Sequence, residues 1–103
     1  MQYLNEQINY SMLNQKSREI FARHYNIKGT YRADDGKLTE ALEFFCKAIE
    51  LNPVDTTALF NRATIKADLG DFKGAKEDFV LVREIESKHL THNSLDSGKI
   101  NIF

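Results

Sequence analysis

The sequence contains one segment that occurs twice, because residues 36–51 recur as residues 70–85 at a constant offset of 34 positions. Ordinary amino-acid usage gives about one identity by chance in a window of this length. The identical pairs are Gly36 and Gly70, Ala41 and Ala75, Glu43 and Glu77, Phe45 and Phe79, and Glu50 and Glu84. A period of this length indicates stacked helical hairpins, in which neighbouring hairpins bury each other's apolar faces.

Each copy predicts two helices that are joined by a tight turn. In the first copy, apolar residues at three- and four-residue steps indicate a helix from about Leu38 to Leu51. The preceding helix is predicted to run from Ser17 or Phe21 to Ala33, and Gly36 supplies the turn. The second copy predicts helices over 56–69, after a cap at Asp55 or Thr56, and over 72–88.

Small and aromatic residues recur at positions where the helices of a hairpin face each other. We expect the small residues at the closest approaches and the aromatic rings in the wider gaps. The small residues are Gly29, Ala41, Ala63 and Ala75, and the rings belong to Tyr25, Phe45 and Phe79.

This combination of spacing, small residues and turn chemistry resembles the tetratricopeptide repeat family over about residues 22–88. The matching residues are Leu69-Gly70-Asp71-Phe72 with Ala75 and Phe79, and Gly36-Lys37-Leu38 with Ala41, Phe45, Ala48 and Leu51-Asn52-Pro53. Ser87 stands where the family usually has a closing proline. The resemblance implies an all-α fold of two antiparallel hairpins, which form a fragment of a right-handed α-solenoid.

The chain is predicted to be one domain with repeats at 21–54 and 55–88. Residues 1–20 are expected to form a capping helix or a lead, since Leu4, Ile8 and Met12 lie at four-residue steps. Residues 89–103 are expected to form a tail, loop-like over 91–99, with apolar residues at its end that could dock on the hairpins.

The resemblance also implies that the first helix of each hairpin lines a concave groove suited to a peptide or a helix of a partner protein. We expect Asn26 and Asn61 to contact a peptide backbone and Phe60 to anchor an apolar side chain. Solvated polar positions without a ligand remain the alternative. The predicted groove residues are Arg23, Asn26, Ile27, Thr30, Asp34, Thr57, Phe60, Asn61, Thr64 and Asp68.

A second predicted surface consists of Phe79, Val80 and Leu81, where the second copy is more apolar than the first. Two repeats are fewer than the roughly three that usually make a stable stack, so the last hairpin needs a cover. The tail, the N-terminal helix or a second copy of the molecule could supply it. We therefore expect either internal covering or a homo-oligomer formed through the terminal hairpin.

Composition narrows the function classes. A formal net charge of -1 gives no general attraction to nucleic acid or to membranes, and no apolar run is long enough to span a bilayer. A single cysteine, Cys46, indicates a reducing, cytoplasmic location. RNA binding remains an alternative, because residues 16–37 carry six cations against three carboxylates, with Tyr25 and Tyr31 between them.

Catalytic and metal sites are weakly indicated. His24 and Cys46 lie on different helices with no third orienting group implied, and His89, His92 and Asp96 are a poor ligand set for zinc. No glycine-rich phosphate loop is present, and no cofactor is expected. The sequence predicts a non-catalytic protein–protein interaction module or assembly scaffold.

Overall fold

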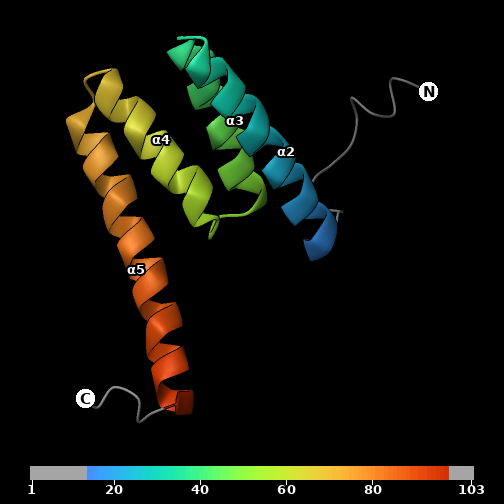
Figure 1. Ribbon diagram of the computed structural model, residues 1–103, viewed down its shortest axis with the longest axis vertical. Helices are drawn as coiled ribbons and strands as arrows, with labels where there is room; N and C mark the ends of the chain where they lie inside the picture. The colour runs from blue at the N-terminus through green and yellow to red at the C-terminus, as the bar shows by residue number, and fades with distance from the viewer. Residues whose placement is uncertain (1–13, 98–103) are drawn as a thin grey trace.

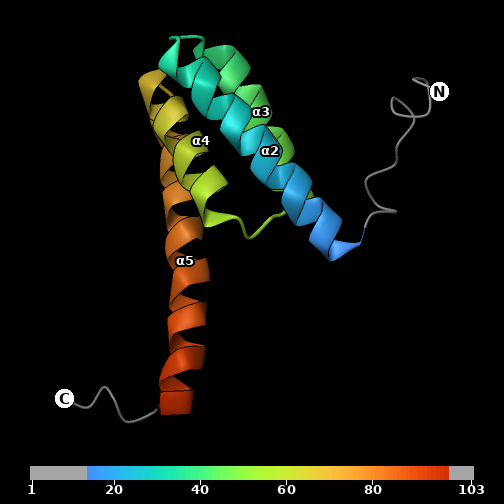
Figure 2. The ribbon, with the colours of Figure 1, turned by 45° about the vertical axis from the view of Figure 1, so that its right-hand side comes forward.

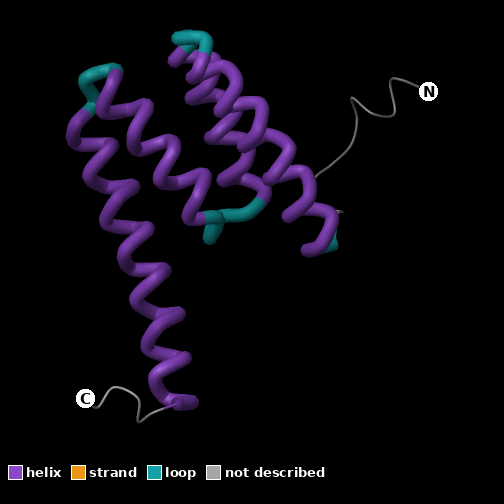
Figure 3. Tube along the Cα trace, viewed as in Figure 1, coloured by secondary structure: helices purple, strands orange, loops and turns teal. Residues whose placement is uncertain are grey.

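The computed structural model describes residues 14–97, with side chains described as far as Lys88, and this part of the chain contains only α-helices and turns (Figures 1 and 3). The helices are α2 (Gln15–Asp34), α3 (Leu38–Leu51), α4 (Thr56–Asp68) and α5 (Phe72–Ser97). Helices α2 and α3 form one antiparallel hairpin and α4 and α5 form the next (Figures 1 and 2). The predicted all-α architecture of two stacked hairpins is confirmed.

Side chains cap the first helix of each hairpin. The Asn14 side-chain oxygen Oδ1 accepts from the Ser17 N–H at 2.8 Å at the start of α2. The Asp55 carboxylate accepts from the Ala58 N–H at 3.1 Å at the start of α4. Each bond satisfies one of the amide groups that a helix N-terminus leaves without an internal partner. Of the two caps considered for α4, Asp55 is therefore the one used.

The two hairpin turns have the same geometry, 34 residues apart. Gly36 and Gly70 have φ of 78° and 91°, in the left-handed region that glycine adopts most readily. The residue after each glycine donates to the carbonyl five positions back, at 2.9 Å and 2.8 Å respectively. This is the Schellman arrangement, and it explains why both copies keep glycine here.

Inside the hairpins, the small residues lie where predicted. Gly29, Ala41, Ala63 and Ala75 are all buried. The approach at Gly29 is close, because a Cβ at this position would lie 2.6 Å from the Phe45 ring. Phe45 fills the resulting space and is only 2% exposed.

Two apolar clusters join the hairpins through α4. Ala58 packs in a cluster with Ala48 and Leu51 of α3, and Ile65 packs in a second cluster with Phe45. The outward side of α3 is therefore covered by the first helix of the following hairpin, as in a solenoid.

The helix ends differ from the predictions at both termini. Helix α2 begins at Gln15, earlier than predicted, so residues 15–20 are part of the first hairpin. Helix α5 continues to Ser97, so the loop predicted over 91–99 is wrong as far as Ser97. Ser87 replaces the proline found at Pro53, and residues 75–97 contain no glycine or proline to end the helix. Predictions for residues 1–13 and 98–103 lie outside the described residues.

Candidate functional site

The predicted groove residues lie on α2 and α4, which run side by side (Figures 1 and 2). A hydrogen bond joins the two helices at the middle of the stripe, where the Asn61 Nδ2 donates to the Asn26 Oδ1 at 3.2 Å. Both side chains are half-buried. The pair therefore forms a polar link across the floor of the predicted groove.

Two threonines flank this pair at equivalent positions. The Thr30 hydroxyl donates to the Asn26 carbonyl, and the Thr64 hydroxyl donates to the Phe60 carbonyl, both at 3.0 Å. Each hydroxyl proton is thus used within its own helix, so towards a ligand these hydroxyls can only accept.

Eight of the ten predicted groove residues line three shallow hollows. One of about 340 Å³ includes Arg23, Asn26 and Thr57, and one of about 260 Å³ includes Thr57, Phe60 and Asn61. The third, of about 170 Å³, includes Thr30, Asp34, Asn61 and Thr64. Ile27 and Asp68 are exposed and line none of these three hollows.

The groove and the predicted assembly surface meet at an aromatic contact. The rings of Phe60 on α4 and Phe79 on α5 pack edge to face, with centroids 5.2 Å apart. Phe60 is half exposed and Phe79 is 38% exposed, so both rings contact solvent. The two surfaces that the sequence predicts separately are therefore continuous at these residues.

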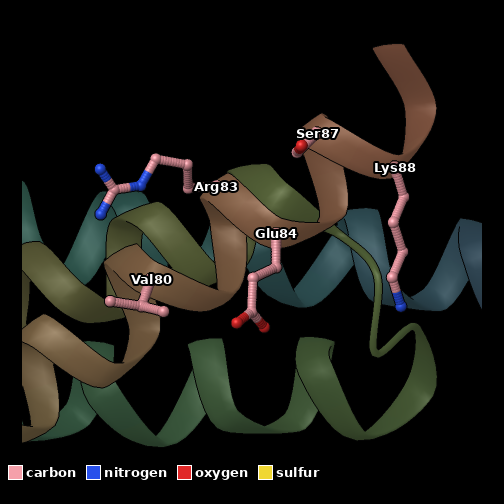
Figure 4. Close-up of a pocket in the computed structure, with 5 residues that line it drawn as sticks. All are labelled: Val80, Arg83, Glu84, Ser87 and Lys88. Carbon is pink, nitrogen blue, oxygen red and sulfur yellow. The ribbon is translucent and has the colours of Figure 1, made fainter. Parts of the chain in front are cut away.

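The other predicted assembly residues face elsewhere. Val80 lines an open hollow of about 640 Å³ along α5, on the same side of the helix as Glu84 and Lys88 (Figure 4). Leu81 is 39% exposed and does not line this hollow. Because successive helical residues point in different directions, Phe79, Val80 and Leu81 do not form one surface.

The comparisons with known proteins agree with this geometry. The sequence profile of the tetratricopeptide repeat matches residues 22–55. An uncharacterized protein of Methanocaldococcus jannaschii is 42% identical over 76 residues, which cover 74% of this chain and 87% of that protein. A tetratricopeptide repeat protein 36 homolog of Nematostella vectensis is 34% identical over 68 residues, 66% of this chain and 38% of that protein. This chain belongs to the tetratricopeptide repeat family.

A third relative, tetratricopeptide repeat protein 36 of Danio rerio, is 44% identical over 52 residues, 50% of this chain and 28% of that protein. The chain thus spans about a third of the length of the named tetratricopeptide relatives it matches. No solved structure matches the chain. The tetratricopeptide match indicates a module for protein–protein interaction in general, and it specifies no partner.

One polar cluster in this tetratricopeptide chain is not predicted by the sequence pattern. Arg62 of α4 binds Asp78 of α5 through two nitrogen–oxygen contacts of 2.8 Å and 2.9 Å, and Lys66 lies 3.2 Å from the same carboxylate. The Arg62 Nη1 also lies 3.6 Å from the Cys46 Sγ. At the equivalent place in the first hairpin, Lys28 lies over the Phe44 ring instead, at 5.5 Å. The repeat therefore offers no signal for the ion pair.

The cluster shifts the pKa values of its members. Burial alone would raise the pKa of the Asp78 carboxyl, but the hydrogen bonds and charges of Arg62 and Lys66 outweigh burial and lower that pKa below its ordinary value. The hydrogen bonds that Arg62 donates to Asp78 raise the pKa of Arg62 against the opposing effect of burial. Asp78 is buried, and its contacts with Arg62 join α5 to α4 within the second hairpin.

Side chains considered for other functions have structural contacts. His24 packs against Tyr25, while Cys46 contacts Arg62. Within the described residues, no three His, Cys, Asp or Glu side chains gather at a possible metal site. His89, His92 and Asp96 lie in α5, where their side chains are outside the described part. None of the described helices is long and apolar enough to cross a membrane.

Proposed function

We propose that this tetratricopeptide protein binds an extended peptide segment of a protein partner in the groove formed by α2 and α4. The observation that carries the proposal is the Asn26–Asn61 pair. Its hydrogen bond uses one hydrogen of the Asn61 side-chain Nδ2 and the side-chain Oδ1 of Asn26. The Asn26 Nδ2 can then donate to one peptide unit of a ligand, and the Asn61 Oδ1 can accept from it.

The neighbouring residues favour a peptide with an apolar side chain. The Phe60 ring, supported by Phe79, offers a half-exposed aromatic surface next to the asparagine pair. Aromatic residues with one supported face are frequent anchors in protein interfaces. We therefore assign Phe60 to an apolar side chain and the asparagines to the adjacent backbone.

The charges at one end of the groove favour a basic peptide residue. Asp34 and Asp68 end α2 and α4. The carbonyl ends of both helices add negative potential beside these carboxylates. A basic peptide residue is therefore expected at this end, whereas Arg23 shares its hollow with Glu19 and Asp55 and selects no single charge.

A displayed library of random octapeptides tests the proposal, followed by fluorescence anisotropy on the selected peptides. We expect Asn26→Ala plus Asn61→Ala to weaken binding at least about tenfold, since two or more hydrogen bonds are lost. Glu43→Ala plus Glu77→Ala, on the exposed outer sides of α3 and α5, is the matched control. Equal binding by the groove variant, with unchanged helicity in circular dichroism, would refute the site.

RNA binding is the alternative function, and the net positive charge of residues 16–37 is the observation that favours it. Three of these cations have partners within the protein. Arg18 donates to the carbonyls of Glu50 and Leu51, and Arg32 pairs with Glu40 at 3.0 Å, while Lys28 lies over Phe44. A titration with generic single-stranded RNA at low salt separates the two functions. Binding that falls steeply with added salt would support RNA.

A further inference from the structure

The two ends of the hairpin stack can each be compared with a buried counterpart inside the same chain. Between the hairpins, α4 presents Ala58, Asn61 and Ile65 to the first hairpin. The first hairpin receives them on a face that includes Phe45 and Ala48. The 34-residue offset gives the equivalent of each of these faces at the opposite end of the stack, where none of the other described helices covers it (Figure 1).

The receiving face recurs on the second hairpin, and its large apolar residues are exposed there. Phe79 occupies the position of Phe45 and is 38% exposed instead of 2%. Phe72 occupies the position of Leu38 and is 71% exposed. Val82 replaces Ala48, so the face keeps its apolar character. We call these residues, together with Phe60, the open end face.

The inserting face recurs on α2. Tyr31 occupies the position of Ile65 and is 66% exposed instead of 4%. Ile27, which is half exposed, occupies the position of Asn61, and His24 occupies the position of Ala58. With Ile20, these residues follow steps of four, three and four, which place them on one side of the helix. We call them the α2 outer stripe.

The residues that would meet between these two faces match in chemistry. Inside the chain, Asn26 and Asn61 form a hydrogen bond across the seam. Their equivalents at the two ends are Phe60 and Ile27, so a polar pair inside the chain corresponds to an apolar pair between its ends. A change on only one side would leave a polar group against an apolar one, and the polar group would lose its hydrogen bond.

We infer that the open end face binds the α2 outer stripe of a second copy of this chain, head to tail, with the packing that already joins the two hairpins. Ile27 of the second copy would then contact Phe60, and Tyr31 of the second copy would contact Phe79. Such a contact uses two different surfaces, so each added copy exposes a new site and the assembly can extend or close into a ring. Because Ile27 of the second copy would cover the Phe60 ring, a second copy and a peptide bound at Phe60 would compete for this residue.

Measuring mass against protein concentration tests this inference, by sedimentation velocity on the full chain from micromolar to millimolar concentration. We expect the wild-type mass to rise with concentration beyond that of one chain. Tyr31→Glu and Phe79→Glu should each remain monomeric, because each variant lacks one of the two faces. An equimolar mixture of the two should form a dimer and nothing larger, since one intact face of each kind remains.

Leu81→Glu is the matched control. Leu81 has the same exposure as Phe79 within one percentage point and lies on the same helix. It occupies the position of Lys47, which is exposed and lies over Tyr25 of its own hairpin, so it lies outside the proposed contact. We expect this variant to assemble like the wild type.

Several outcomes would overturn the inference. One is a wild type that stays monomeric at every concentration. Another is self-association of Tyr31→Glu alone, which indicates a symmetric contact between two open end faces. The third is an equal loss of assembly in Leu81→Glu and Phe79→Glu. Circular dichroism checks that each variant folds. If Phe79→Glu does not fold, Phe72→Glu takes its place, because the side chain of Phe72 is more exposed.

Discussion

The missing side chain at Gly29 permits a close contact in the first hairpin. The Phe45 ring lies 2.6 Å from the place where a Cβ of residue 29 would be, and the ring is almost completely buried. In the second hairpin, Ala63 occupies the equivalent position and the equivalent ring, Phe79, is partly exposed and turned to Phe60. The hairpin with glycine at this position therefore has a buried ring, and the hairpin with alanine has a partly exposed one.

Replacing Gly29 with alanine should therefore destabilise the fold. The new Cβ would overlap the Phe45 ring, and overpacking of this kind typically costs about 1–3 kcal/mol. Urea denaturation measures the loss as a lower midpoint. Combining Gly29→Ala with Phe45→Leu should recover part of it, because the smaller side chain makes room. An unchanged midpoint in Gly29→Ala would contradict the packing described here.

The Asp78 carboxylate should make stability depend on pH in the acid range. Its pKa is lower in the folded protein than the ordinary value of 3.8, so its contribution is present above that value. The contribution is lost as the pH falls through the folded pKa. We expect Asp78→Asn to lower the urea midpoint at neutral pH and to reduce the further loss between neutral and strongly acid pH. Glu43→Gln, on an exposed side chain, is the control.

Among the helices, α5 differs from its counterpart most clearly. Helix α3 ends at Leu51, two residues before Pro53, whereas α5 continues through Ser87 to Ser97. Ser87 in place of proline permits a longer helix, whereas the polar residues over 91–99 predict a loop. Polar residues alone do not end a helix, and the continuing backbone hydrogen bonds outweigh their weak preference for turns.

Ser87→Pro tests this explanation. Proline removes a backbone donor and clashes with the preceding turn, so α5 should end near Ile85. Far-ultraviolet circular dichroism should show a loss of helical signal. The thermal midpoint of the hairpins should change little, because Asp78 and Phe79 lie before the break. Unchanged helicity, or unfolding of the whole chain, would contradict this account.

At the scale of the whole molecule, the repeat made the architecture predictable. Glycine, alanine and phenylalanine at matched positions specify turns, close approaches and ring sites, and these are properties of one hairpin. The Arg62–Asp78 pair and the Phe60–Phe79 contact could not be found in this way, because the first copy has Lys28 with Phe44 and Asn26 with Phe45 at those positions. Where the copies differ, only the three-dimensional structure identifies partners.

The Asn26–Asn61 hydrogen bond has a consequence for the order in which hairpins can join. If α2 of another molecule replaced α4 on the first hairpin, Ile27 of that molecule would face Asn26. The Asn26 side chain would then lose the hydrogen bond from Asn61. If α4 of another molecule packed on the open end face, Asn61 would face Phe60 with the same loss. The Asn26–Asn61 hydrogen bond therefore favours packing between the two hairpins of one chain over packing of a helix from another copy at the same place.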